Sequence, residues 1–288
     1  MMAHVAAAGE QRGRVVLKLG CTEPSQIALE AAVRIAQAFQ SEIESVFVEE
    51  PALLDVAGFP FAREISLTGR HTRELSPEVM ARHIRHVAEV LTRRVEALAR
   101  LAEVPSRSTI VRDDPFQAMA RVCQACGPWN VIALADGAMP RNGELIRQLF
   151  EQVQDTTGVV LTGPKARTIR GVVIVVVEDV AHLEPMLRAA RRLLGGDGGE
   201  RVKLLLLADD EVRLSELEGQ VRLALEPDGD VDVVKAPPVH GSSQVAAEAL
   251  RRLRGGFVLG QLGGRLVPVT GDLGYLASVL ECPLLVVR

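Results

Sequence analysis

The sequence predicts an α/β protein made of two tandem, doubly wound, five-stranded parallel sheets. Short apolar runs alternate with longer segments of helical periodicity, as expected for strands joined by crossover helices. Several runs are continuously apolar, such as residues 172–177, which is typical of parallel strands buried on both faces. The order of strands and helices starts again near residue 170, so we expect domains at residues 14–163 and 170–288.

The first half opens with a strand at residues 15–19 and a turn that leads into a helix. Ser25 is a suitable N-cap for this helix. Its apolar residues recur at a helical period and are Ile27, Ala31, Ile35 and Ala38. The other predicted strands span residues 43–48, 108–111, 130–135 and 158–161. The other predicted helices span residues 77–101, 115–126 and 144–153, each after a capping or turn signal.

Residues 51–75 are predicted to form a long, partly packed connection. Pro51, Gly58 and Gly69 punctuate it, and its small apolar clusters are Leu53–Leu54 and Phe59–Phe61. Because long connections in compact domains are often functional, we expect this segment either to cover the ligand crevice or to bind a partner.

The second half repeats the order of the first after a turn-rich stretch. Its predicted strands span residues 172–177, 202–207, 231–234, 257–259 and 284–287. Its predicted helices span residues 183–194, 212–225, 243–253 and 273–280. Parallel sheets of this kind bind ligands at the carboxyl ends of their strands, where the strand order reverses. We therefore expect a site between the first and fourth strands of a half.

Composition excludes several classes of protein. Hydrophobic residues make up 48% and charged residues 24%, as in a packed globular protein. No apolar run approaches the roughly 18 residues of a membrane span, and residues 1–14 lack the apolar core of a signal peptide, so we expect a cytoplasmic protein without a membrane partner. The 33 Lys and Arg residues do not outnumber the 37 Asp and Glu residues, so we expect no nucleic-acid partner. Four cysteines are too few for a disulfide framework.

Both halves resemble the universal stress protein (UspA-like) family. In the first half the resemblance rests on residues 15–36 and on residues 114–122 running into residues 131–134. In the second half it rests on residues 260–263 and on the closing Cys-Pro strand at residues 277–287. The resemblance implies that the last strands of the two halves, residues 159–161 and 284–287, pair with each other. One chain would then imitate a dimer of single-domain proteins, and the sequence leaves open whether such chains form further homo-oligomers.

ATP-binding members of this family carry an Asp after the first strand and a Gly-x2-Gly-x9-Gly-Ser/Thr loop after the fourth. The glycines let backbone N–H groups approach the phosphates. In the first half these positions are taken by Gly20, Ala135, Ala138 and Gln148, so we expect no phosphate binding there.

The second half keeps more of the ATP-binding pattern. Its first two loop glycines are Gly260 and Gly263, and the candidate third is Gly271, eight residues on where the family has ten. Asp272 stands where the family has a hydroxyl, and a carboxylate repels phosphate unless a divalent cation intervenes. Glu178 or Asp179 would supply the acidic residue. The resemblance thus implies ATP with Mg²⁺ as the candidate ligand of these residues.

Other reactive residues have competing interpretations. Cys123 and Cys126 form a Cys-x-x-Cys pair, but they end a helix where redox pairs begin one, so packing is favoured over a redox or zinc site. His83 and His86 share a helical face, which is compatible with a metal site, but without an acidic or cysteine ligand nearby in sequence a solvated surface is favoured. Cys21 lies at a strand-to-helix junction and is a candidate reactive thiol. We assign no catalytic or metal-ligating residue.

These features favour a non-catalytic stress-response protein that senses or signals through a small ligand, a nucleotide or a protein partner. A pure interaction module with both nucleotide sites degenerate is a second hypothesis. A third is an enzyme, either a weak nucleotide-binding hydrolase at residues 260–272 or a thiol-redox enzyme at Cys123 and Cys126.

Overall fold

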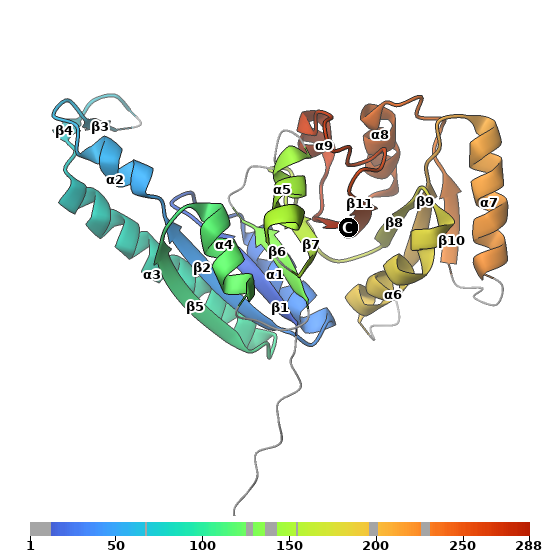
Figure 1. Cartoon of the computed structure of the whole chain (residues 1–288), viewed down its shortest axis with the longest axis horizontal. Coiled ribbons are helices and arrows are strands. Elements are labelled where there is room, and N and C mark those ends of the chain that lie inside the picture. Colours follow the sequence, from blue (N-terminus) through green and yellow to red (C-terminus); the bar gives the residue numbers. More distant parts are fainter. Residues whose placement is uncertain are drawn as a thin grey trace, which may run out of the picture.

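One continuous sheet runs through the molecule. The computed structural model describes residues 13–66, 68–124, 129–135, 143–153, 155–195, 201–225 and 231–288. Within these residues, ten strands lie in the order β10-β9-β8-β11-β12-β7-β6-β1-β2-β5 (Figure 1). The strands are β1 (Arg14–Leu19), β2 (Glu42–Glu49), β5 (Ser106–Arg112), β6 (Asn130–Leu134), β7 (Thr156–Leu161), β8 (Val173–Val177), β9 (Val202–Leu206), β10 (Val231–Lys235), β11 (Phe257–Gln261) and β12 (Leu284–Val287).

The two halves of the sheet meet at β7 and β12. These strands pair antiparallel, with Leu161 opposite Leu284 and Gly158 opposite Val287, whereas the pairs within each half are parallel. The predicted pairing of residues 159–161 with residues 284–287 is confirmed. The two predicted five-stranded sheets are therefore joined into one, because each half would otherwise end in a strand with unpaired backbone N–H and C=O groups.

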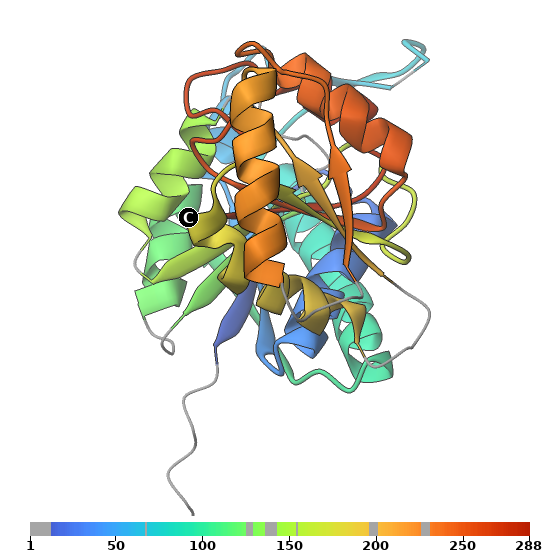
Figure 2. The same ribbon diagram turned by 90° about the vertical axis from the view of Figure 1, so that its right-hand side faces the viewer.

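Helices cover both faces of the sheet. The helices on one face are α1 (Gln26–Ala38), α3 (Pro77–Leu101), α6 (Leu183–Leu194) and α7 (Glu211–Leu225), and those on the other are α4 (Pro115–Gln124), α5 (Glu144–Gln152), α8 (Ser243–Leu253) and α9 (Gly274–Val279). Figure 2 views the second half end-on, with α7 and α8 on opposite sides of the edge strand β10. Of the described helices, none is long and apolar enough to cross a membrane.

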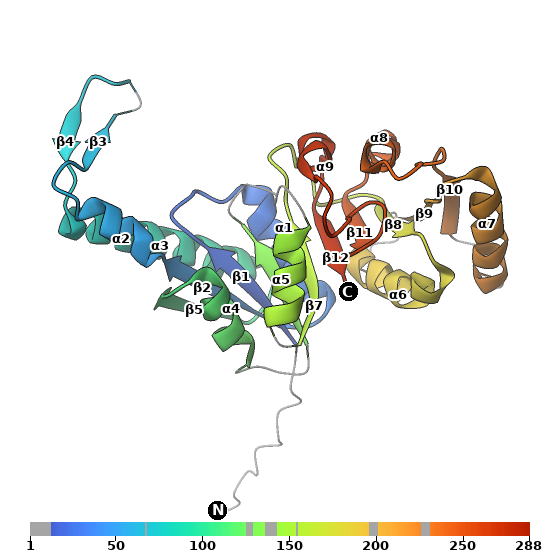
Figure 3. The ribbon, with the colours of Figure 1, turned by 45° about the horizontal axis from the view of Figure 1, so that its top comes forward.

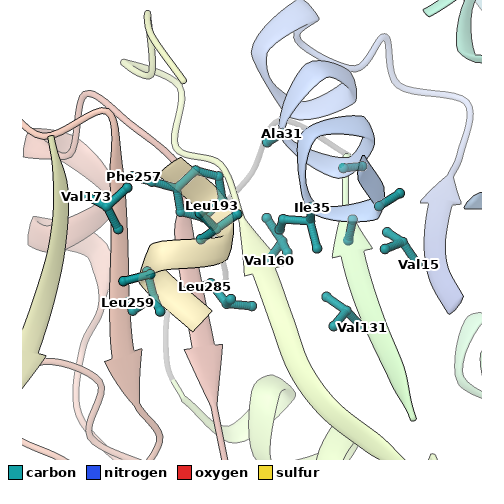
Figure 4. Close-up of a cluster of buried hydrophobic side chains, with 14 of the residues drawn as sticks. Val15, Ala31, Ile35, Val131, Val160, Val173, Leu193, Phe257, Leu259 and Leu285 are labelled. Carbon is teal, nitrogen blue, oxygen red and sulfur yellow. The ribbon is translucent and has the colours of Figure 1, made fainter. Parts of the chain in front are cut away.

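The hydrophobic core crosses the junction between the halves. On the face of α1 and α6, Ile35 and Val160 from the first half lie in one buried cluster with Leu285 and Phe257 from the second (Figure 4). The end of α6 is tied to α1, because the Arg34 guanidinium donates to the Leu193 carbonyl oxygen at 2.7 Å. Each Å² of apolar surface buried at this junction stabilises the fold by about 25 cal/mol. Because side chains of both halves are buried together there, the junction is part of the hydrophobic core.

Serine caps define two helix starts that the sequence predicted. Ser25 Oγ accepts from the Ala28 N–H at 3.1 Å, and Ser76 Oγ accepts from the Val79 N–H at 3.3 Å. Each bond satisfies one of the donors that a helix leaves open at its first turn.

Residues 51–75, predicted only as a long, partly packed connection, contain regular elements that the sequence did not predict. They contain helix α2 (Pro51–Ala57) and a hairpin of β3 (Arg63–Ile65) and β4 (Thr72–Glu74). Pro51 sits in the first turn of α2, where its fixed φ favours a helix. Figures 1 and 3 show the hairpin projecting away from the large sheet.

Candidate functional site

The predicted site of the second half lies where the strand order reverses. The chain runs from β8 outward through β9 to β10 and then returns to β11 on the other side of β8. In sheets of this kind ligands bind where the strand order reverses, which is here between the carboxyl ends of β8 and β11. Glu178 directly follows β8, and Gly260 lies in β11 just before the loop that contains Gly263.

Glu178 binds the backbone of that loop. Its Oε2 accepts from the Arg265 N–H at 2.6 Å, and its Oε1 accepts from the Leu266 N–H at 3.2 Å. The Arg265 guanidinium also pairs with Oε2 at 3.3 Å. The side chain of Glu178 is only 8% exposed. A carboxylate of the protein therefore occupies the kind of backbone N–H pair that otherwise attracts an anionic ligand.

The neighbouring N–H groups of the loop also have acceptors within the protein. The Leu262 N–H donates to the Val287 carbonyl oxygen at 2.9 Å, and the Gly263 N–H donates to that of Val267 at 2.9 Å. The Gly264 N–H donates to the Gln261 carbonyl oxygen at 3.4 Å. Five successive N–H groups, those of residues 262–266, are thus hydrogen-bonded internally.

Geometry explains the glycines of this loop without a phosphate. Gly263 has φ of +84°, a left-handed conformation that glycine adopts without strain. A Cβ atom on Gly264 would lie 2.5 Å from Glu178 Oε1, so the approach of the carboxylate requires glycine there. Gly260 is buried in β11 beneath Leu266. The sequence prediction did not include Gly264, although the double glycine was a visible signal.

Arg265 connects two carboxylates at this edge of the sheet. Its guanidinium donates to Asp209 Oδ2 at 2.8 Å in addition to Glu178. This hydrogen bond is the main reason that the pKa of Asp209 lies below its ordinary value, while burial acts against it and the Gly241 N–H lowers it further. The Asp209 bond also raises the pKa of Arg265. Asp209 and Arg265 were not predicted, although Asp209 comes shortly after β9 and therefore lies at the same edge.

The remaining predicted residues of the second half make local contacts. Asp179 caps the short 3-10 helix Val180–His182 through the Ala181 N–H at 2.9 Å. Asp272 is exposed and accepts from the Gly274 N–H at 2.7 Å. A Cβ atom on Gly271 would lie 2.4 Å from Pro268 Cγ. The structure thus brings Glu178 together with the Gly260–Gly264 stretch, whereas Asp179 and Asp272 bond within two residues of themselves.

The His182 ring also lies beside β11. Its Nε2 lies 3.1 Å from Gln261 Nε2, and its buried Nδ1 has no hydrogen-bond partner among the described residues.

The first half lacks a phosphate loop in its described part. Gly20 and Ala135 are buried at the ends of β1 and β6, and Ala138 lies outside the described residues. Gln148 lies within α5, where its side chain donates to Glu144 at 3.2 Å. A helical Gln148 cannot take the role of the third loop glycine.

The candidate thiols and histidines differ in exposure. Cys123 lies in α4 and is buried, and Cys126 lies outside the described residues. Burial raises the pKa of the Cys282 thiol to about 12, whereas Cys21 is exposed. His83 and His86 are both exposed on α3. In the described part of the chain, no three His, Cys, Asp or Glu side chains are grouped closely enough to hold a metal ion.

Comparison with known proteins adds information at the level of fold. No protein-family profile matches the chain, and no curated protein sequence matches it. Among solved structures, a universal stress protein from Archaeoglobus fulgidus superposes with a TM-score of 0.58 over 95% of this chain and 96% of that protein. This chain has the universal stress protein fold.

Two further structures, both from Pseudomonas aeruginosa, share the universal stress protein fold with this chain. One is described as a putative universal stress protein, with a TM-score of 0.54 over 96% of this chain and 93% of that one. The other is described as functionally unknown, with a TM-score of 0.52 over 96% and 92%. Sequence identity to the three structures is only 13%, 14% and 14%, so the likeness extends to the fold alone.

Proposed function

We propose that this protein acts in the stress response as a non-catalytic universal stress protein, by binding a protein partner or a small ligand and not by binding ATP. The observation that carries the proposal is the position of Glu178. The Glu178 carboxylate accepts the N–H groups of Arg265 and Leu266, so these two donors of the glycine loop are not open to a nucleotide phosphate. Two anions held on the same N–H groups would also repel each other.

The first experiment identifies what the protein carries. The freshly purified protein is denatured, and the released small molecules are identified by mass spectrometry. ATP with Mg²⁺ is then titrated into the intact protein by calorimetry at concentrations up to about 1 mM, the weak end of specific affinity. We expect no stoichiometric nucleotide, no binding heat and no ATP hydrolysis. A stoichiometric nucleotide in the wild-type protein would contradict the proposal.

Two variants test whether the Glu178 carboxylate or the missing hydroxyl at position 272 prevents phosphate binding. Glu178→Ala frees the two N–H groups, so we expect weak binding of inorganic phosphate to appear in this variant only. Asp272→Ser restores the family's hydroxyl but leaves Glu178 in place, so we expect this variant to bind inorganic phosphate no better than the wild type. Equal gains in both variants would show that Glu178 does not close the site.

A further inference from the structure

The segment between β2 and α3 projects as an arm, and its two strands do not pair with the large sheet. The arm, residues 51–75, contains α2 and the β3–β4 hairpin, and it extends beyond the end of α3 (Figures 1 and 3). All six residues of β3 and β4 are exposed, so within the described residues no core lies beneath the hairpin. An isolated two-stranded hairpin is only marginally stable in water. An additional covering element would therefore stabilise the arm.

The arm also exposes large apolar side chains. The exposed fractions are 53% for Val56, 51% for Phe59, 78% for Phe61 and 64% for Ile65. The rings of Phe59 and Phe61 stack with their centroids 5.5 Å apart. Because the whole chain has only seven Phe residues, two of them side by side on one exposed arm are a concentration typical of an interaction surface.

The hydrogen bonds of the hairpin show which backbone groups point outward. The Ser66 N–H donates to the His71 carbonyl oxygen at 2.9 Å, and the Leu75 N–H donates to that of Ala62 at 3.1 Å. In an antiparallel pair the bonded residues alternate along each strand. The N–H and C=O groups of Thr72 and Glu74 therefore point away from β3. Figures 1 and 3 show β4 on the side of the hairpin that faces away from the body.

We propose that β4 pairs antiparallel with β4 of a second copy of this chain, about a two-fold axis at Thr72. The result is a four-stranded sheet of the order β3-β4-β4-β3. The two Thr72 residues then lie opposite each other, and each Glu74 lies opposite Arg70 of the other copy. Opposite charges at paired positions stabilise an antiparallel pair, and Thr–Thr pairs do the same.

The charges of the arm favour a second copy of the chain as the partner, and β4 as the strand that pairs. The arm carries equal numbers of basic and acidic residues, namely Arg63, Arg70 and Arg73 against Asp55, Glu64 and Glu74. A surface that binds its own copy through opposite charges must carry both signs, whereas a nucleic-acid partner would require an excess of positive charge. On the β3 edge, a two-fold axis at Arg63 or at Glu64 would place like charges opposite each other, and an axis at Ile65 would pair no opposite charges.

Analytical ultracentrifugation of the full chain tests the proposal at about 1 to 100 µM, the range in which small interfaces associate. We expect the wild type to form a dimer within this range. Thr72→Pro removes an outward N–H and should leave the hairpin folded, because proline is tolerated at an open strand edge. We expect this variant to sediment as a monomer. Ile65→Pro is the matched control, since it blocks the other edge, and it should still dimerise.

Charge reversal supplies a second test that does not depend on proline. We expect Arg70→Glu and Glu74→Arg each to weaken dimerisation at least about tenfold, because each replaces two attractive pairs with two repulsive ones. The double variant restores opposite charges and should recover the dimer. A wild type that stays monomeric at about 100 µM, a dimer that Thr72→Pro does not weaken, or equal effects of Thr72→Pro and Ile65→Pro would each overturn the proposal.

Discussion

Replacing Glu178 with alanine should lower the free energy of unfolding by about 3 kcal/mol. The substitution leaves the N–H groups of Arg265 and Leu266 without their acceptor, and a buried donor left unsatisfied costs about 1–3 kcal/mol. The ion pair with the partly exposed Arg265 guanidinium contributes less than about 1 kcal/mol. Glu178→Gln keeps one acceptor oxygen in nearly the same shape, so we expect about half of the loss.

Equilibrium unfolding in urea and thermal unfolding both measure the loss at Glu178. At about 2 °C per kcal/mol for a chain of this size, Glu178→Ala should lower the Tm by about 6 °C. Asp272→Ala is the control, because this exposed carboxylate accepts a single local bond, and its loss should cost less than about 1 kcal/mol. The interpretation of the loop is refuted if Glu178→Ala is no more destabilising than Asp272→Ala.

Three further predictions follow from the same contacts. The lowered pKa of Asp209 means that its ionised form stabilises the native protein, by less than about 1 kcal/mol at this half-exposed position. The stability difference between wild type and Asp209→Asn should therefore be constant above the ordinary pKa of 3.8 and vanish as the pH falls through the lower native pKa, as urea titrations at several pH values would show. Gly143→Ala should lower the free energy of unfolding in urea by about 1–3 kcal/mol, because its Cβ would lie 2.2 Å from the Pro268 carbonyl oxygen. Gly219→Ala, where a Cβ in α7 would meet open space, should raise the same free energy by about 0.8 kcal/mol. A variant that keeps only Cys21 should react with a thiol reagent at pH near 8 within minutes, but one that keeps only Cys282 should react only after denaturation, since burial raises its pKa to about 12.

The sequence could predict the order of strands and helices because local signals determine most of them. The α6 helix spans Leu183–Leu194 and α8 spans Ser243–Leu253, the same bounds that periodicity predicts. Asp114 also caps α4 as expected, because its Oδ1 accepts from the Phe116 N–H at 2.9 Å. Continuously apolar runs such as Val173–Val177 are buried on both faces, as a parallel sheet requires.

The candidate site could be predicted only in part, because its decisive contacts join residues far apart in the chain. Glu178 and Arg265 are 87 positions apart, and no local pattern shows that one binds the other. The family pattern directed attention to Gly260 and Gly263, but it could not show that the Glu178 carboxylate accepts hydrogen bonds from the backbone of this loop. The hairpin of the arm was not predicted because β3 and β4 are only three residues long each, too short to show the alternation that indicates a strand.

The antiparallel contact between β7 and β12 has a consequence for how the halves associate. When two separate chains pair their edge strands, the fraction paired falls as the protein is diluted. Here both strands belong to one chain, so each edge meets the other at an effective concentration set by the connection between them, in the millimolar range for short linkers. The joined sheet therefore persists at any dilution, and the only strand edges left open in the described large sheet are its two ends, β10 and β5.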